Sequence, residues 1–203
     1  LALTFAIGAL VVLFAATGCT GAPSPKGWSG PVAQGNTIYM GSVKGKLLAL
    51  DPNNGSMLWQ FPADSRTVGA VYSSPVVDDG VVYLGAYDGK FYAVDVTTRA
   101  EKWAKPFEAR GPIIGEAVVA GSVVLLGSAD GNLYALDKVT GAEVWRFKAR
   151  GGIWGGLVVD AGKAYFGTLG HKFYAVDLNT HKPAWEFDTK AAVAGGALVV
   201  GNV

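Results

Sequence analysis

The stretch "ALDKVTGAEVW" at residues 135–145 recurs three more times along the 203-residue chain. The same eleven-residue frame reads "ALDPNNGSMLW" at 49–59, "AVDVTTRAEKW" at 93–103 and "AVDLNTHKPAW" at 175–185. Each copy opens with Ala, carries Asp two residues later and closes with Trp. A fixed frame that returns at roughly every 40 residues is the sequence signature of a repeat architecture.

Three series of residues share one spacing of 44, 42 and 40. The first is the frame aspartates, Asp51, Asp95, Asp137 and Asp177. The second is the frame tryptophans, Trp59, Trp103, Trp145 and Trp185. The third is a set of glycines, Gly41, Gly85, Gly127 and Gly167. The shared steps indicate four equivalent units, and "AAVAGGALVVGNV" (191–203) matches the start of a fifth.

Each unit predicts four short antiparallel strands. In the second unit these are "YSSPVVD" (72–78), "VVYLGAY" (81–87), "KFYAVDV" (90–96) and "EKWAKPF" (101–107), with turn residues between them. The third strand is apolar on both faces, as in "NLYALD" (132–137), which is typical of a sheet covered on both sides. The pattern therefore predicts an all-β protein, a β-propeller of four-stranded blades.

The frame residues have structural tasks in such a ring. A Trp can bury roughly 150–250 Å², so one Trp per blade on the outer strand is expected to pack against the next blade, beside the small Ala that opens the frame. Gly55 and Gly141 suit a turn with positive φ. Arg99 and His181 replace this glycine in the other copies, so we expect those two turns to be looser or of another type.

The units "VYLGAYDGKFYAVDVTTRAEKW" (82–103) and "VLLGSADGNLYALDKVTGAEVW" (124–145) resemble pyrroloquinoline quinone (PQQ)-type β-propeller repeats, and the frame is similar to that family's tryptophan-docking motif. The resemblance covers residues 28–203. It implies a ring of seven or eight blades, of which the chain would hold four and the start of a fifth. The family includes quinoprotein alcohol dehydrogenases, the outer-membrane assembly lipoprotein BamB and extracellular sensor domains, so the fold alone does not decide the function.

Residues 1–18 carry no charge, which is typical of a short transmembrane helix or of a signal peptide. The sequence "ATGC" (16–19) resembles a bacterial lipobox, although Ala16 stands where Leu is more usual. We therefore expect a lipoprotein signal peptide at 1–18, a lipidated Cys19 with a tether at 19–27, and the repeats at 28–203. An ordinary signal peptide with a chance Cys is the alternative. A lipid anchor would hold the exported protein on the periplasmic or extracytoplasmic side of a membrane.

The net charge and the small numbers of Cys and His limit the kinds of partner and metal site that the chain could have. The net charge of +1 gives no reason to expect nucleic acid as a partner. A single Cys excludes a disulfide scaffold, and two His make a His-rich metal site hard to build. The acidic residues mostly occupy frame or turn positions, so no catalytic residue and no metal ligand is predicted.

Two functions stay open. The first is a non-enzymatic scaffold, BamB-like, which binds a protein partner at the cell envelope and needs no cofactor. The alternative is a quinoprotein alcohol or sugar dehydrogenase with its active site in further blades. That resemblance implies PQQ, calcium and an adjacent pair of cysteines, and this sequence has no cysteine pair. A ligand sensor domain is a third, more distant hypothesis.

The segments that lead from the fourth strand of one unit to the first strand of the next hold the candidate binding residues. Aligned positions in these crossings are Trp28, Tyr72, Ile114, Trp154 and Ala194. The aromatic members are expected either to pack in the core or to anchor a partner. Basic residues open the same crossings: Arg66, Arg110, Arg150 and Lys190. They predict a basic rim for an acidic partner, unless they are merely solvated loop charges. Glu116 is the lone carboxylate near this mouth, placed either to pair with a rim arginine or to act as a catalytic-type group.

Overall fold

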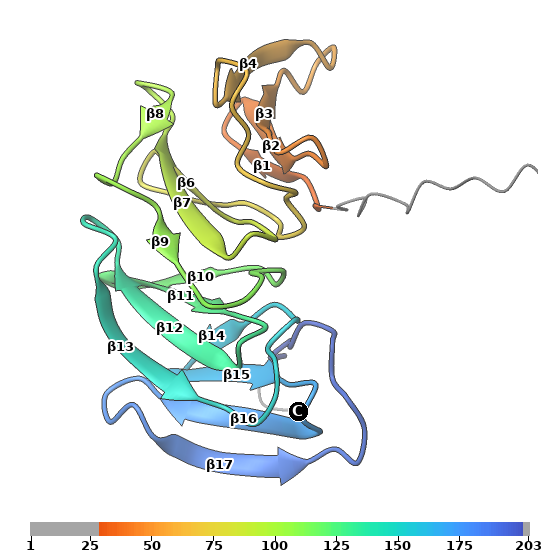
Figure 1. Ribbon diagram of the computed structural model, residues 1–203, viewed down its shortest axis with the longest axis vertical. Coiled ribbons are helices and arrows are strands. Elements are labelled where there is room, and N and C mark those ends of the chain that lie inside the picture. The colour runs from red at the N-terminus through yellow and green to blue at the C-terminus, as the bar shows by residue number, and fades with distance from the viewer. Residues whose placement is uncertain (1–28, 201–203) are drawn as a thin grey trace, which may run out of the picture.

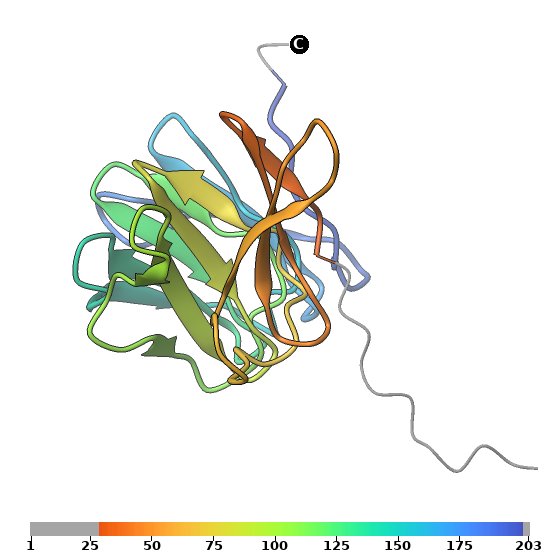
Figure 2. The same ribbon diagram turned by 90° about the horizontal axis from the view of Figure 1, so that it is seen from above.

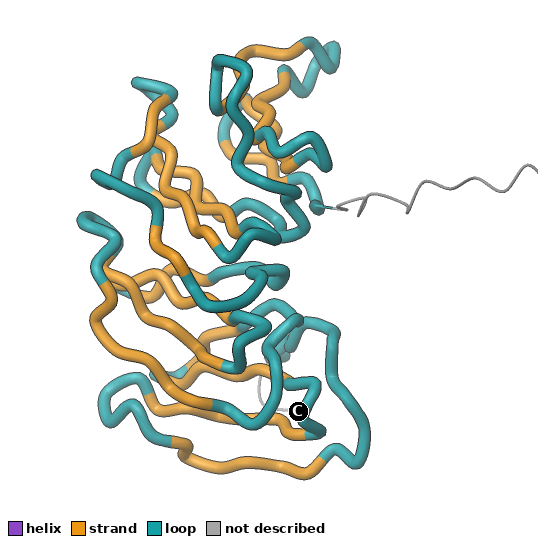
Figure 3. Tube along the Cα trace, in the orientation of Figure 1, coloured by secondary structure: helices purple, strands orange, loops and turns teal. Residues whose placement is uncertain are grey.

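The computed structural model describes residues 29–200, and its regular structure is antiparallel β-sheet. Four sheets follow one another in chain order along an arc (Figure 1). Seen from the first sheet, the twisted sheets lie behind one another (Figure 2). Strands and loops make up the whole described trace (Figure 3). The prediction of an all-β propeller with four-stranded blades is thereby confirmed, and the sheets are called blades 1 to 4.

The strands of each blade pair with their chain neighbours, except that β9 of blade 2 pairs with β7. Blade 1 consists of β1 (Val32–Gln34), β2 (Thr37–Gly41), β3 (Leu47–Leu50) and β4 (Met57–Phe61). Blade 2 consists of β5 (Val76–Asp78), β6 (Val81–Gly85), β7 (Lys90–Asp95), β8 (Ala100–Glu101) and β9 (Phe107–Glu108). Blade 3 consists of β10 (Val118–Ala120), β11 (Val123–Gly127), β12 (Asn132–Asp137) and β13 (Glu143–Lys148). Blade 4 consists of β14 (Val158–Asp160), β15 (Lys163–Gly167), β16 (Lys172–Asp177) and β17 (Pro183–Asp188).

The first strand of each blade is the inner one. β1 contacts β5, β5 contacts β10, and β10 contacts β14, while the outer strands β4, β8, β13 and β17 lie on the convex side of the arc (Figure 1). Every blade therefore begins at the inner side, and the chain must cross back inward before the next blade. The described part of the segment after β17, residues 189–200, contains no strand.

The hydrophobic core is a set of apolar layers between blades. One layer joins blades 1 and 2, a second joins blades 2 and 3, and a third joins blades 3 and 4. Strand β6 shows why the middle strands are apolar on both faces. Its Val82 and Leu84 belong to the first layer, whereas Val81 and Tyr83 belong to the second. Alternation along a strand sends neighbouring side chains to opposite faces, so each blade stabilises both of its neighbours.

The outer strand of blade 2 corrects one expectation. A continuous strand over 101–107 was predicted, but the structure has two short strands, β8 and β9, with an irregular stretch between them. In blade 3 Leu133 pairs with Phe147, two residues after the frame Trp, whereas in blade 2 the equivalent Phe91 pairs with Phe107, four residues after the frame Trp. Pro106 within the stretch has no N–H to donate to the ladder. The extra residues are accommodated as a bulge in the outermost strand, and β8 and β9 both still pair with β7.

The turns that lack glycine were also wrongly predicted. Arg99 and His181 adopt φ of 59° and 57°, the same left-handed region as Gly141 at 76°. The Arg99 N–H donates to the Asp95 carbonyl at 2.8 Å, and the His181 N–H bonds the frame Asp carbonyl of its own turn at the same distance. All these turns therefore share one geometry. The frame aspartate imposes it, because its carboxylate accepts further backbone N–H groups inside the turn.

Candidate functional site

The crossing segments converge on a cavity of about 690 Å³. Four aligned positions from the sequence, Tyr72, Ile114, Trp154 and Ala194, all line it. The other lining residues are Ser74, Tyr87, Gly115, Glu116, Gly155, Gly156 and Gly196. The structure thus brings together residues that lie about one repeat apart in the chain. Trp28, the remaining aligned position, lies outside the described residues.

The recurring glycine of the second strand explains why the crossings run alike. A Cβ on Gly85 would lie 2.3 Å from the side chain of Ile113, and one on Gly127 would lie 2.3 Å from Ile153. Gly41 and Gly167 meet valines of their crossings in the same way, at 2.2 Å. Each glycine is therefore the seat of a β-branched side chain. That side chain directly precedes the aligned cavity residue, and so fixes its position.

Successive crossings also touch through their backbones. A Cβ on Gly115 would lie 2.2 Å from the carbonyl oxygen of Gly155, and one on Gly155 would lie 2.1 Å from the carbonyl oxygen of Gly195. No side chain fits between these segments. The neighbouring crossing already occupies the place of a side chain, and the cavity is consequently walled in part by bare backbone.

Two aromatic side chains of the cavity are open to solvent. Trp154 is 41% exposed and Tyr87 is 44% exposed. The Tyr87 ring lies 5.3 Å from the ring of Tyr72, tilted by 46°. Large exposed aromatic side chains in a concave site are what a binding hot spot offers.

Glu116 is the only charged residue that lines this cavity in the described part of the chain. Partial desolvation by the cavity walls raises the pKa of its carboxyl, although much of the side chain stays open to solvent. Within residues 29–200 its carboxylate makes no hydrogen bond and no ion pair, so the alternative of a pair with a rim arginine is not observed. Its backbone carbonyl accepts the N–H of Leu157 at 3.4 Å.

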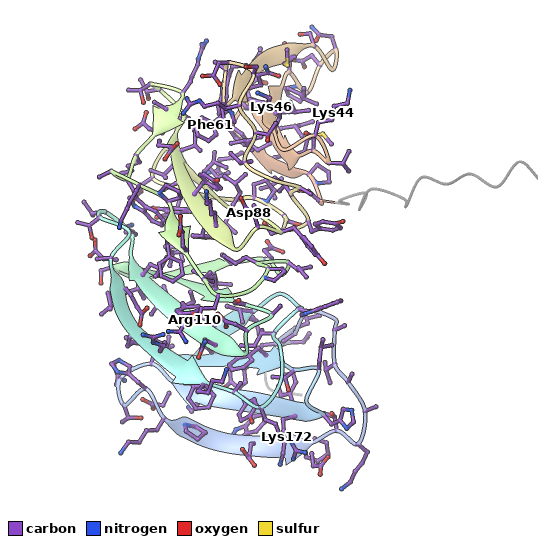
Figure 4. All side chains as sticks on the ribbon, viewed as in Figure 1. Lys44, Lys46, Phe61, Asp88, Arg110 and Lys172 are labelled. Atoms are coloured by element: carbon purple, nitrogen blue, oxygen red, sulfur yellow. The ribbon has the colours of Figure 1, made fainter. Side chains whose placement is uncertain are left out.

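The basic residues of the crossings lie outside the cavity lining. Arg66 pairs with Asp64 at 2.9 Å, and Lys190 pairs with Asp188 at 3.2 Å. The exposed side chains of Arg110 and Arg150 form no ion pair within residues 29–200. Basic residues recur along the arc, from Lys46 beside blade 1 through Arg110 to Lys172 in blade 4 (Figure 4). Two of the four predicted rim charges are thus available to a partner, and two are partly neutralised.

Three of the four frame tryptophans lie at blade boundaries. Trp103 is 3% exposed, contacts Gly141 of blade 3, and donates its indole N–H to the Lys138 carbonyl at 3.3 Å. Trp145 stacks on His181 of blade 4 at 4.6 Å. Trp59 packs against the layer between blades 1 and 2. Trp185 is 47% exposed and contacts rings of its own blade.

Sequence reasoning missed one inter-blade contact. The Lys138 ammonium lies 2.9 Å from the carboxylates of both Asp78, which ends the first strand of the preceding blade, and Asp79, which begins the turn after it. Hydrogen bonds to the two carboxylates raise the pKa of Lys138, and the bond to Lys138 lowers the pKa of Asp79. The pattern of adjacent aspartates was visible in the sequence, but it was interpreted as a turn.

The cavity does not fit a calcium–quinone centre. Calcium takes roughly six to eight oxygen ligands, whereas this lining supplies one carboxylate. Within residues 29–200 no group of three or more His, Cys, Asp or Glu side chains could hold a metal ion. In the same part of the chain no helix has the length and apolar character to cross a bilayer. Cys19 and the expected signal peptide and tether lie outside the described residues.

Comparisons with known proteins agree with the repeat. A protein-family model described as "Outer membrane protein assembly factor BamB" matches residues 11–109 and 107–202. No curated protein matches the sequence.

Solved structures share the fold. The crystal structure of BamB from Moraxella catarrhalis is 22% identical with a TM-score of 0.71, covering 85% of this chain and 52% of that chain. The computationally designed Ika8 protein is 16% identical with a TM-score of 0.70, covering 81% and 50%. The designed Ika4 protein is 19% identical with a TM-score of 0.60, covering 73% and 88%. The chain spans about half the length of the first two.

Proposed function

This chain belongs to the family of outer membrane protein assembly factor BamB, and we propose that it is a non-enzymatic scaffold that binds a protein partner at the cell envelope. The family's description suggests a partner from the machinery that assembles outer membrane proteins. In this proposal Cys19 carries the lipid that tethers the exported domain to a membrane, and the scaffold uses no cofactor. The quinoprotein alternative has no support in the described cavity.

The observation that carries the proposal is the convergence of the crossings. Equivalent residues from successive repeats meet around one cavity, and they leave Trp154 and Tyr87 exposed there. Covering such apolar surface is favourable by roughly 25 cal/mol per Å². A rigid arc of blades fixes these anchors before binding, so little ordering entropy is lost when a partner docks.

The unpaired rim charges support a partner with acidic groups. Arg110 and Arg150 open neighbouring crossings, and their guanidinium groups have no acidic partner among the described residues. Charges of this kind act mainly on the rate and orientation of encounter. We therefore assign the anchoring to the cavity and the steering to these arginines.

Photo-cross-linking in membranes tests the scaffold proposal. A photoreactive residue at Tyr87 should yield a cross-link to an envelope protein in cells that express the full chain. The double variant Arg110→Glu/Arg150→Glu should keep the wild-type circular dichroism and reduce that cross-link about tenfold. Lys102→Glu/Lys182→Glu changes the net charge equally at exposed positions outside the cavity, and should leave the cross-link intact.

Two outcomes would count against this function. An unchanged cross-link in the Arg110/Arg150 variant would remove the rim from the interface. The second outcome is saturable binding of PQQ and calcium at about one per chain, measured by tryptophan fluorescence and calorimetry. It would favour an oxidoreductase over the scaffold.

A further inference from the structure

The cavity combines two features that seldom occur together on a surface. Apart from the Ser74 hydroxyl, its walls are aromatic, aliphatic and backbone groups, yet one carboxylate, Glu116, lines the same space. Other carboxylates at blade boundaries already accept hydrogen bonds. The Asp130 carboxylate accepts one from the Arg110 N–H, and the Asp78 carboxylate accepts one from the Lys138 ammonium. Glu116 has no such partner within residues 29–200. A carboxylate held against apolar walls without a counter-charge is poised for a cation from outside.

The aromatic residues suit the same occupant. Trp154, Tyr72 and Tyr87 border the cavity, and the faces of such rings attract a cation within about 6 Å. Ile114 and Ala194 supply aliphatic contacts for an unbranched hydrocarbon stem. A lysine or arginine side chain has both parts, an apolar stem and a charged end.

We propose that this cavity receives a lysine or arginine side chain from the protein partner, with its stem against Trp154 and Ile114 and its cation paired with Glu116. The inference rests on the proposed scaffold function and adds the chemistry that the central anchor recognises. The volume of about 690 Å³ lies within the range of roughly 300–1,000 Å³ of ligand pockets, so the side chain can enter together with part of its backbone. Gly155 and Gly156 line the cavity with backbone alone, so their carbonyl and amide groups are the polar groups that the partner's backbone would meet there.

The surrounding charges define the sequence around the basic residue. Arg110 and Arg150 lie outside the cavity, where they would repel further basic residues and attract acidic ones. The partner loop is therefore expected to carry one central basic residue flanked by acidic residues. The need for a basic residue at the centre of this loop distinguishes the site from a surface that binds any polyanion.

A pair of blocked peptides tests the pocket directly. The first is acetyl-Asp-Gly-Lys-Gly-Asp-amide, and the second has norleucine in place of Lys, which keeps the stem and removes the charge. Each is titrated into the full chain in non-ionic detergent, with tryptophan fluorescence and calorimetry as readouts. We expect the Lys peptide to bind about tenfold more tightly, a difference of about 1.4 kcal/mol.

Matched variants assign that preference to one residue. Glu116→Gln keeps the size of the side chain and should remove most of the preference for the Lys peptide, leaving only the attraction of the aromatic faces. Glu108→Gln removes a carboxylate from the outer strand β9 and should keep the tenfold preference. Trp154→Phe should remove most of the fluorescence change while calorimetry still detects binding.

The outcomes separate this inference from the scaffold function. Equal binding of the two peptides to the unaltered chain, or no binding of either at millimolar concentration, overturns the basic-residue pocket. An unchanged preference in Glu116→Gln overturns it as well. If the membrane cross-link persists in those cases, the scaffold function stands without this pocket. If the cross-link is absent while the Glu116-dependent preference is present, the pocket stands and the envelope partner does not.

Discussion

At the scale of single residues, the recurring glycines and three of the four frame tryptophans make contacts between repeats. Trp103 packs on Gly141, whereas the equivalent Trp145 packs on His181. Gly127 seats Ile153, and its counterpart Gly41 seats a valine. The glycines recur without exception because a Cβ there would collide with the β-branched side chain of the crossing. The tryptophans recur as well, although the residue on which each one packs differs.

The tryptophan contacts are therefore expected to differ in energy with their burial. Trp103→Ala should lower the free energy of unfolding by about 3–5 kcal/mol, since truncating a buried large aromatic side chain removes its apolar contacts and leaves a cavity. Trp185→Ala, at a frame position that is 47% exposed, is the matched control and should cost much less. Urea denaturation of both variants measures the difference. Equal losses would show that the boundary contact is not what the frame tryptophan supplies.

At the scale of elements, the turn between the third and fourth strands depends on its frame aspartate. The Asp137 carboxylate accepts the backbone N–H groups of Val139 and Thr140 and the Thr140 hydroxyl, at 2.8 to 3.1 Å. These hydrogen bonds, the Thr140 backbone bond first, lower the pKa of Asp137 below its ordinary value of 3.8. Asp95 and Asp177 show the same direction for the same reason.

The lowered pKa values predict how stability depends on pH. A carboxyl with a lower pKa in the folded state contributes stability above its unfolded value of 3.8, and loses it as the pH falls through the folded value. The free energy of unfolding should therefore decrease from pH 4 toward pH 2. Asp137→Asn should flatten this decrease in urea titrations at successive pH values. Asp160→Asn removes an exposed carboxylate outside these turns and should keep the wild-type slope.

Elements that depend on local sequence patterns could be predicted, whereas those that depend on the pairing of strands could not. Strand positions and the turns with glycine follow local patterns, and the aligned crossing positions meet in the cavity because the repeat places them equivalently. Trp103 lies 11 residues before Ile114 while Trp145 lies nine before Trp154, so the extra length was visible. Its location as a bulge was not, because that depends on the pairing register.

Contacts between repeats were the least predictable. Lys138 and its partners Asp78 and Asp79 are 60 and 59 residues apart, and no recurring pattern marks them. The left-handed turn at His181 was missed because propensity disfavours a non-glycine residue there, while the aspartate and the stacked Trp145 hold it in place.

At the scale of the whole molecule, stability is a chain of boundaries between neighbouring blades. Each apolar layer joins two blades, and none joins three. Repeat proteins of this kind have stabilities close to a sum of unit and nearest-neighbour terms. Weakening one boundary should therefore divide the molecule at that boundary and leave distant blades protected.

The Lys138 contact offers a way to test this division. Lys138→Met keeps the aliphatic stem but removes the ammonium that bridges blade 3 to Asp78 and Asp79 of blade 2. Amide hydrogen exchange should become several-fold faster in β5, β6 and the turn before β13, and stay unchanged in blade 4. Lys172→Met is the matched control, because Lys172 pairs with Glu186 inside blade 4 at 2.9 Å and bridges no boundary. Equal acceleration across all four blades would mean that the arc unfolds as one cooperative unit, and that its boundaries do not act separately.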